Sequence, residues 1–245
     1  SKITDMSSIF RNSNFNGDIS NWNTSNITNM EWMFFKAEKF NSDISNWDTS
    51  NVTSMERMFS FAINFNQSVN FDTSKVISML SMFYSAEKFN QPLNFDTSNV
   101  TDMSYMFRNT KSFNQALNFN TSNVKKMERI FAYSDNFNQP LNNWDVSKVT
   151  NMAGMFESSI FNQDLNNWNT SNVTDMSYMF SYATRFNQPL NFDTSKVTNM
   201  MSMFCNAYNF NQNISSWNFD NIINCDYMFD NAKAFLDKYN NNSEP

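Results

Sequence analysis

Histidine is absent from this chain of 245 residues, and glycine, cysteine and proline are scarce, with two, two and four residues. Without histidine, the Ser-His-Asp and Cys-His catalytic arrangements, a His-ligated zinc or haem, and a pH sensor near neutrality are excluded. The two glycines, Gly17 and Gly154, lie far apart. Neither a P-loop nor a dinucleotide-binding turn can be built from them.

Basic clusters and long apolar runs are missing as well. The net charge is −6 and the longest basic run is Lys125-Lys126, whereas nucleic-acid binding needs clustered Lys and Arg. No apolar run of about 18 residues and no leader-like segment is found. We therefore expect no nucleic-acid partner, no signal peptide and no membrane insertion by this segment.

A repeat of 24 or 25 residues dominates what is present. Each unit reads approximately F-N-Q-x-L-N-(x)-W/F-D-T-S-N-V-T-x-M-x-x-M-F-x-x-A, and every methionine except Met201 occupies a fixed position in it. The units begin at Phe15, Phe40, Phe65, Phe89, Phe113, Phe137, Phe161, Phe186 and Phe210. One such unit cannot bury its own apolar face, so successive units must stack around a shared core.

The hydrophobic period changes within each unit. L-N-F alternates with period two, which predicts a short parallel strand. The following apolar residues lie three or four apart, as at Val173, Met176 and Met179, which predicts a helical segment with Ser171 as its N-cap. The V-T-x-M part could equally be extended, with only M-x-x-M-F-x-x-A helical or 3₁₀. The pattern thus predicts a repeat solenoid with one short strand and one short helical segment per turn.

Two lengths of unit occur. Where the aromatic residue of the strand is Trp, as at Trp144, it lies seven residues after the Phe of Phe-Asn; where it is Phe, as at Phe119, it lies six after. A one-residue bulge whose space the larger indole fills would explain this correlation.

Stacking would place polar residues in columns. The Asn after each Phe could form a regular ligand-binding or ice-binding array, or could cap backbone groups at a turn, which we favour.

A second column contains Asp48, Asp72, Asp96, Asp145 and Asp193. It could hold a cation or support a metal-assisted hydrolase. Because Asn replaces Asp in other units, a turn residue that bonds its own backbone is favoured. No catalytic residue, metal ligand or cofactor is predicted.

Binding specificity in repeat proteins is usually carried by exposed positions that differ between turns. One such position precedes the second core Met and holds Arg57 and Arg129 as well as aromatic residues; another lies four residues later. The predicted ligand-binding residues are Trp32, Phe61, Tyr105, Tyr133, Tyr178, Tyr182 and Tyr227. Edge packing between turns is their alternative role. A rival binding surface is the strand face with Asn94, Asn118, Asn142, Asn166 and Asn191.

The two cysteines are not expected to form a disulfide. Their positions in the repeat place Cys205 and Cys225 roughly 9 Å apart, beyond the separation that a disulfide tolerates. Because Cys225 occupies a core methionine position, a buried thiol is expected there.

The strings FNQPLNNWDVSKVTNMAGMF at 137–156 and FNQDLNNWNTSNVTDMSYMF at 161–180 resemble the BspA-type leucine-rich-repeat region of mycoplasma and other bacterial surface lipoproteins. The resemblance extends from about Ile3 to Phe235. It implies a leucine-rich-repeat-like, α/β or β-rich right-handed coil. It also implies extracellular display on the cell surface, through an anchor outside this segment, and a role in adhesion or host interaction. It supplies no catalytic residue.

We expect one solenoid domain over residues 1–239, followed by a polar tail over 240–245. The domain would consist of a half repeat over 1–14, nine repeats over 15–234 and a degenerate C-terminal turn over 235–239. Because the chain starts in mid-turn, we expect either a fragment of a longer array or a chain from which a cap or lipidated leader has been removed. The expected function is a non-enzymatic recognition or adhesion module for a protein or glycan of a host or neighbouring cell. The alternative is a structural spacer or self-assembling scaffold with end-to-end association.

Overall fold

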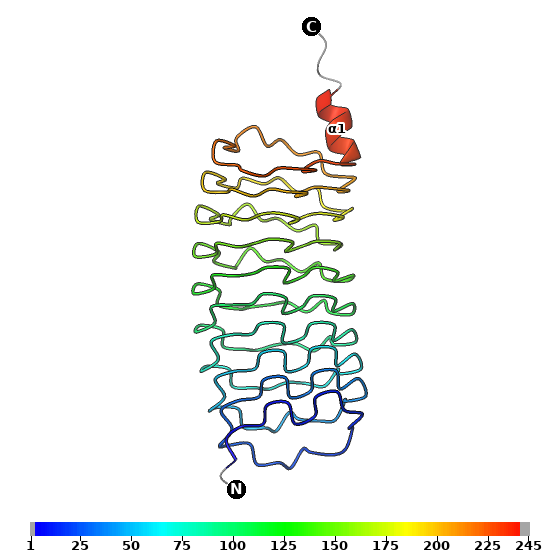
Figure 1. Ribbon diagram of the computed structural model, residues 1–245, viewed down its shortest axis with the longest axis vertical. Coiled ribbons are helices and arrows are strands. Elements are labelled where there is room, and N and C mark those ends of the chain that lie inside the picture. The colour runs from blue at the N-terminus through cyan, green and yellow to red at the C-terminus, as the bar shows by residue number, and fades with distance from the viewer. Residues whose placement is uncertain (1–2, 241–245) are drawn as a thin grey trace.

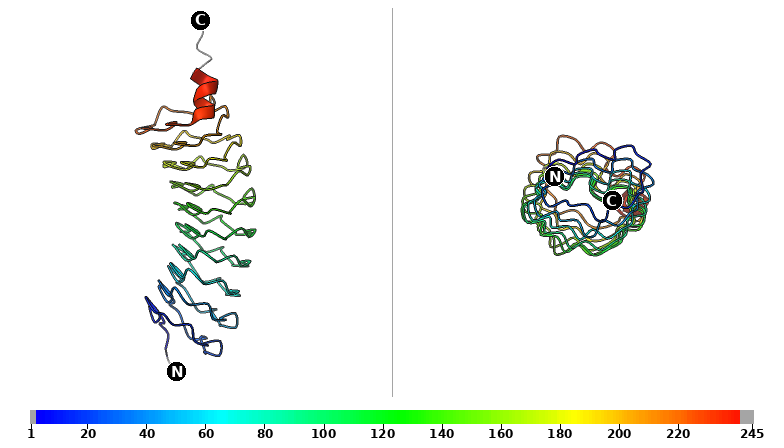
Figure 2. Two further views of the ribbon diagram at one scale, coloured as in Figure 1. Left: turned by 90° about the vertical axis from the view of Figure 1, so that its right-hand side faces the viewer. Right: turned by 90° about the horizontal axis from the view of Figure 1, so that it is seen from below.

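The computed structural model describes residues 3–240. The chain winds into successive turns stacked along one long axis, with the two termini at opposite ends (Figure 1). Seen along that axis, the turns lie over one another around a shared contour (Figure 2). Backbone hydrogen bonds join neighbouring turns, for example from Trp32 N–H to Glu56 O (2.9 Å). The expected repeat fold is therefore confirmed.

Within residues 3–240, regular secondary structure is confined to one helix, α1, at Lys233–Asn240. Isolated parallel bridges connect the turns at the residue before the first core Met or its equivalent. They are Asp5–Asn29, Asn29–Ser54, Ser78–Asp102, Asp102–Lys126, Lys126–Asn151, Asn151–Asp175, Asp175–Asn199 and Asn199–Asn224. Parallel pairing thus lies in the V-T-x-M stretch, which agrees with the extended alternative for that stretch.

The predicted strand at L-N-F is wrong, because no part of this stretch forms a ladder between turns. In the units with Trp, the extra residue instead lies in a β-turn, closed for example by Trp47 N–H donating to Ile44 O (3.2 Å). The indole N–H of Trp47 donates to Ile19 O of the preceding turn (3.1 Å), and that of Trp144 donates to Leu117 O (3.3 Å). The units with Trp thus use the indole to connect two turns.

The predicted helical segment is also wrong. In the second turn, Met33 N–H donates to Met30 O (3.3 Å) and Phe35 N–H donates to Trp32 O (3.0 Å), which closes successive β-turns. Trp32 and Lys36 have φ angles of 59° and 54°, whereas a right-handed α-helix requires φ near −63°. The same two positions are left-handed in the other described turns. The apolar spacing of three and four therefore comes from consecutive turns of the backbone.

The Asp-Thr-Ser segment forms an Asx turn, as the Asp/Asn alternation predicted. Asp72 Oδ1 accepts hydrogen bonds from the backbone N–H of Ser74 (2.9 Å) and from its hydroxyl (2.6 Å). The buried Thr73 donates its hydroxyl to Asp96 O in the next turn (2.9 Å). The predicted N-cap role of Ser171 is wrong, because no helix follows it.

The Asn after each Phe satisfies backbone groups, as we favoured, but between turns instead of within one. Asn41 Oδ1 accepts the N–H of Asn66 (2.8 Å), and Asn66 Oδ1 accepts that of Asn90 (2.9 Å). The side-chain amide of Gln91 also donates to Asn66 O and Oδ1 (both 3.1 Å). These amides form a continuous column along one side of the coil, which we call the amide side.

Stacked phenylalanine rings fill the interior between these polar columns. The Phe34 ring centroid lies 3.7 Å from that of Phe40 in the same turn and 5.5 Å from that of Phe59 in the next. The core methionines pack with them, and Met103 is 0% exposed. One apolar core therefore extends through the stacked turns.

α1 follows the last turn of the coil and extends away from it along the long axis (Figure 1). The Phe235 ring stacks on Phe229 at 4.1 Å between centroids. The predicted degenerate turn 235–239 is therefore helical, and Asn240, assigned to the tail, ends α1. The remainder of that tail, 241–245, lies outside the described residues, as do residues 1–2.

Both cysteines are free thiols, which confirms that Cys205 and Cys225 form no disulfide. The predicted burial of Cys225 is wrong, since its side chain is exposed. Met200 at the equivalent position is 0% exposed, because a further turn stacks on it. Within residues 3–240 no further turn stacks on Cys225.

Candidate recognition ridge

The positions that vary most between turns lie along one edge of the coil, which we call the ridge. In every turn it comprises the two left-handed positions and the residue three places after the first of them. In the second and third turns these are Trp32, Phe35, Lys36, Arg57, Ser60 and Phe61. The backbone N–H groups of the left-handed residues donate to the next turn, as from Arg57 to Leu80 O (3.0 Å). A ligand on the ridge would therefore be contacted by side chains.

The seven predicted binding residues all lie on the ridge. Tyr133, Tyr182 and Tyr227 are 37%, 53% and 70% exposed. The other four are half-buried, namely Trp32, Phe61, Tyr105 and Tyr178. Of these, Phe61 packs on Tyr84 of the next turn at 4.8 Å between ring centroids, so edge packing between turns is part of its role. A role of the seven in binding stays a prediction.

A groove of about 320 Å³ opens on the N-terminal half of the ridge. It is lined by Trp32, Phe35, Arg57, Ser60, Phe61, Ser81, Tyr84, Tyr105 and Arg108. A second hollow of about 220 Å³ shares Tyr84 and Arg108 with it and extends to Tyr133. The structure thus brings four of the predicted residues, Trp32, Phe61, Tyr105 and Tyr133, to two adjoining hollows. Tyr178, Tyr182 and Tyr227 lie further along the ridge.

Sequence reasoning missed Phe35, Tyr84 and Arg108, which line the groove between the predicted residues. They share the position three residues after the first left-handed one. That position also varies, with Arg11, Phe35, Ser60, Tyr84, Arg108, Ala132, Glu157, Ser181, Cys205 and Asp230 in successive turns. The same criterion of variability would have found them.

Besides Arg129, whose guanidinium carbon lies 5.9 Å from the Tyr178 ring centroid, three arginines of the ridge lie over aromatic rings. The guanidinium carbons of Arg57 and Arg11 lie 4.4 and 4.9 Å from the Trp32 ring centroid. That of Arg108 lies 5.2 Å from each of the Tyr84 and Tyr133 centroids. Among residues 3–240 no carboxylate lies within ion-pair distance of these three guanidinium groups. Such stacking, worth about 0.5–1 kcal/mol at exposed sites, orients the arginines without neutralising them.

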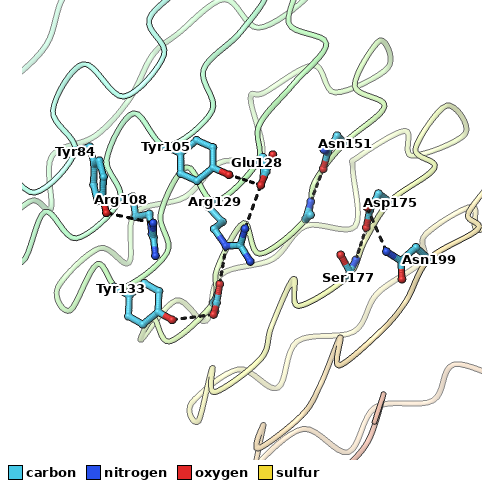
Figure 3. Close-up of polar contacts among 12 residues, drawn as sticks. Tyr84, Tyr105, Arg108, Glu128, Arg129, Tyr133, Asn151, Asp175, Ser177 and Asn199 are labelled. Atoms are coloured by element: carbon cyan, nitrogen blue, oxygen red, sulfur yellow. Dashed lines mark hydrogen bonds and ion pairs between the residues drawn. The ribbon is translucent and has the colours of Figure 1, made fainter. Parts of the chain in front are cut away.

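Arg129 is held differently, in a closed polar network (Figure 3). Its Nε donates to Glu157 Oε2 (2.9 Å) and its Nη1 to Glu128 Oε1 (3.1 Å). The Tyr105 hydroxyl donates to Glu128, and the Tyr133 hydroxyl donates to Glu157 Oε1 (2.8 Å). Both carboxylates are therefore occupied by partners from the ridge itself.

These contacts fix the protonation states within the network. Burial and the hydrogen bond to Glu128 raise the pKa of Tyr105, and burial and the hydrogen bond to Glu157 raise that of Tyr133. Burial alone would lower the pKa of Arg129, but its hydrogen bonds to Glu157 and Tyr105 outweigh this and raise it. At neutral pH both phenols are protonated and the guanidinium is charged.

Charge divides the ridge into two halves. Its basic residues are Arg11, Lys36, Arg57, Arg108 and Arg129. Beyond Arg129 the ridge has Glu157 and Asp230 and no further basic residue. The aromatic groove therefore lies in the basic half.

The rival surface is also accessible. Asn94, Asn118, Asn142 and Asn191 are exposed and Asn166 is half-buried. Asn166 Oδ1 accepts the backbone N–H of Asn191 (3.1 Å), so this row also links turns.

Within the part of the chain that the structure describes, no group of three His, Cys, Asp or Glu side chains is placed to hold a metal ion. The carboxylates of the Asp column accept hydrogen bonds from serines, as Asp145 does from Ser147 N–H (2.9 Å). A search of the same residues finds no helix with the length and apolar character needed to cross a membrane.

The sequence matches one protein-family model in four overlapping stretches, residues 1–94, 69–160, 92–188 and 143–242. The model is described as "Mycoplasma protein of unknown function, DUF285". The matches together extend over almost the whole chain, as the repeats do. No curated protein matches the chain.

Proposed function

The chain belongs to the DUF285 family of mycoplasma repeat proteins, and on that premise we propose that it is a non-enzymatic recognition module that binds a host protein or glycan through the ridge. The resemblance to the BspA-type leucine-rich-repeat region supports display of the module on the cell surface. The anchor would lie in another part of the protein.

The observation that carries this proposal is the concentration of aromatic and arginine side chains around one groove. These residue types supply much of the binding energy at protein interfaces. The residues at the other positions of the repeat are nearly the same in every turn, and they form the core or link neighbouring turns. Recognition at variable side chains on a uniform array is the usual arrangement in repeat proteins.

Binding of the 245-residue chain to host cells and to a panel of glycans and matrix proteins tests the proposal. Replacing Tyr105, Tyr178 and Tyr182 by Ser should weaken binding by roughly tenfold or more. Thermal unfolding of the variant checks the fold, because Tyr105 also bonds Glu128. Lysine at Asn118 and Asn142 should leave binding intact. The reverse pattern, with loss only in the lysine variant, would move the site to the asparagine row.

A spacer or self-assembling scaffold is the second candidate. The first and last described turns expose apolar side chains, with Ile9 48%, Phe219 45% and Ile223 87% exposed. Apolar surface of this kind favours association. Light scattering over a range of concentrations distinguishes the candidates, since a scaffold should form growing rods and a recognition module should keep a constant mass.

A further inference from the structure

The basic half of the ridge contains cationic groups that the fold itself does not neutralise. Arg57 and Arg108 line the groove, and neither has an ion pair within residues 3–240. The chain as a whole is acidic, with 23 acidic and 17 basic residues. Carboxylates are thus abundant, yet among residues 3–240 none lies within ion-pair distance of either arginine and none lines the groove.

Arg129 is the comparison for these arginines, because carboxylates of the ridge neutralise it. It occupies the same position of the repeat as Arg57 and pairs with Glu128 and Glu157. Glu157 belongs to the turn after Arg129. In the turn after Arg57, the same position of the repeat is occupied by Tyr84. Glu56 precedes Arg57 as Glu128 precedes Arg129, yet it forms no ion pair within the described residues.

The stacked arginines are oriented for a planar anion. A guanidinium group that stacks on a ring keeps the N–H groups at its own edges free of the ring, so that they can donate two parallel hydrogen bonds to a carboxylate. Arg108 Nη1 donates to the Tyr84 hydroxyl at only 3.3 Å, and its Nε is buried without a hydrogen-bond partner. Its hydrogen-bonding capacity is therefore largely unused by the protein.

The walls of the groove favour a sugar over a peptide. The rings of Trp32, Phe61 and Tyr84 line the groove, and the parts of them that the arginines leave uncovered offer apolar surface to the C–H face of a pyranose ring. A peptide that adds as a strand would need unpaired backbone groups. Here Phe61 N–H already donates to Tyr84 O (2.7 Å), and Ser81 N–H donates to Ser104 O (2.9 Å). Recognition must use side chains alone.

The two arginines lie two turns apart, about 10 Å along the stacking axis at the usual spacing of paired chains. We propose that the groove binds an acidic glycan through its carboxylates, with Arg57 and Arg108 as the anion-binding residues and Trp32, Phe61 and Tyr84 as the platform for the sugar rings. This rests on the proposed function and specifies its ligand class. The shared chemistry is a carboxylate-bearing sugar, either a uronate within a polymer or a sialate at a chain end.

Calorimetric titration of the whole chain with four sugar probes tests the proposal. Hyaluronan oligosaccharides present uronates, and sialyllactose presents a terminal sialate. Carboxyl-reduced hyaluronan and lactose are their neutral counterparts. At least one acidic probe should bind roughly tenfold or more tightly than its neutral counterpart, which corresponds to about 1.4 kcal/mol or more. A Glu-Tyr peptide is the fifth probe and tests whether the groove prefers an acidic peptide to an acidic sugar.

Matched variants locate the site. Arg57→Gln and Arg108→Gln should each weaken binding of the acidic probe by about tenfold, and Arg108→Lys should weaken it less because the charge remains. Arg185→Gln removes the same charge from an exposed position off the ridge and should have no effect. Unfolding temperatures show that each variant is folded.

Several results would overturn the inference. Equal binding of acidic and neutral sugars, preference for the peptide, or an equal loss in Arg185→Gln would each do so. Binding of host cells or a matrix protein that depends on the ridge tyrosines but not on Arg57 or Arg108 would leave the proposed function standing and remove this inference. Absence of binding to every probe, protein and cell would remove both.

Discussion

The amide side and the ridge differ in how far their contacts repeat from turn to turn. On the amide side, the backbone N–H groups of Asn41, Asn66 and Asn90 each donate to the side-chain oxygen of the equivalent Asn in the preceding turn, at 2.7, 2.8 and 2.9 Å respectively. On the ridge, Arg57 and Arg129 occupy one position of the repeat but contact an indole ring and two carboxylates respectively.

This difference separates stability from specificity. Bonds that recur at every turn hold the coil together, because each turn contacts only its neighbours. The ridge side chains add contacts between turns, as Phe61 does with Tyr84, but these contacts are not the same in every turn. The side chains can therefore vary without loss of the fold, and the variation creates an open groove in one half and a closed network beside it.

The sharpest test of the comparison is the contrast between a repeated core residue and a residue beside the ridge. Met103→Ala should lower the free energy of unfolding by about 2–5 kcal/mol, because it leaves a cavity in the core. Met201 is half-buried and contacts the Tyr178 hydroxyl through its sulfur (3.7 Å), so Met201→Ala should cost under about 1 kcal/mol. Similar urea midpoints for the two variants would contradict the assigned register.

The two ridge arginines should differ in their effect on stability. Arg129→Gln should destabilise the protein by about 1–2 kcal/mol, because it leaves Glu157 half-buried without its charged partner. Arg57→Gln should cost under about 1 kcal/mol, the value of its stacking on Trp32. Urea unfolding of both variants measures this. A larger loss in Arg57→Gln would mean that Arg57 is structural and would weaken its assignment to a ligand.

The left-handed positions of the ridge give effects of opposite sign. Ser202 has a φ angle of 53° and Gly154 one of 60°. Ser202→Gly should raise the unfolding free energy by up to about 1 kcal/mol, because left-handed backbone is unfavourable for residues with a Cβ. Gly154→Ala should lower it by about 1–2 kcal/mol, since its Cβ would also lie 2.7 Å from Arg129 Cγ. Ser177→Gly is the control, expected to be destabilising, because Ser177 is not left-handed.

The smallest expected effect concerns how stability depends on pH, which the Asx turns should control in acid and the ridge in alkali. Hydrogen bonds from serines lower the pKa of the Asx-turn aspartates below 3.8. Their contribution is therefore present above that pH and is lost as the pH falls through the lowered pKa. The raised pKa of Tyr105 acts at the other end, since its contribution is present below 10.0 and is lost as the pH rises through the raised value.

Replacing Asp48, Asp72, Asp96, Asp145 and Asp193 by Asn should flatten the acid limb of the urea midpoint against pH, and Tyr105→Phe should flatten the alkaline limb. A variant that alters both limbs would show that the two regions are coupled.

Much of the local structure followed from residue types. The D-T-S segment predicted an Asx turn, and Asp72 and Ser74 form it. The helix prediction failed because the spacing of Met30, Met33 and Phe34 fits both a helix and a chain of β-turns. The left-handed positions were only weakly signalled, by Gly154 and by Asn12, Asn109, Asn206 and Asn231, because glycine and asparagine adopt this conformation more readily than other residues. The ridge was predicted from variability, but its groove residues Tyr84 and Arg108 were missed.

The sequence by itself determined the repeat, its register and the identity of the core, because a periodic apolar pattern can be buried only by stacking equivalent positions. The tertiary structure decided the backbone path and the character of the ridge. A left-handed Trp32 or Arg57 is stable where its backbone N–H donates to the next turn, to Glu56 O or Leu80 O, and so compensates for its strain. Whether an arginine is neutralised depends on which residue the adjacent turn places beside it, Tyr84 beside Arg57 or Glu157 beside Arg129.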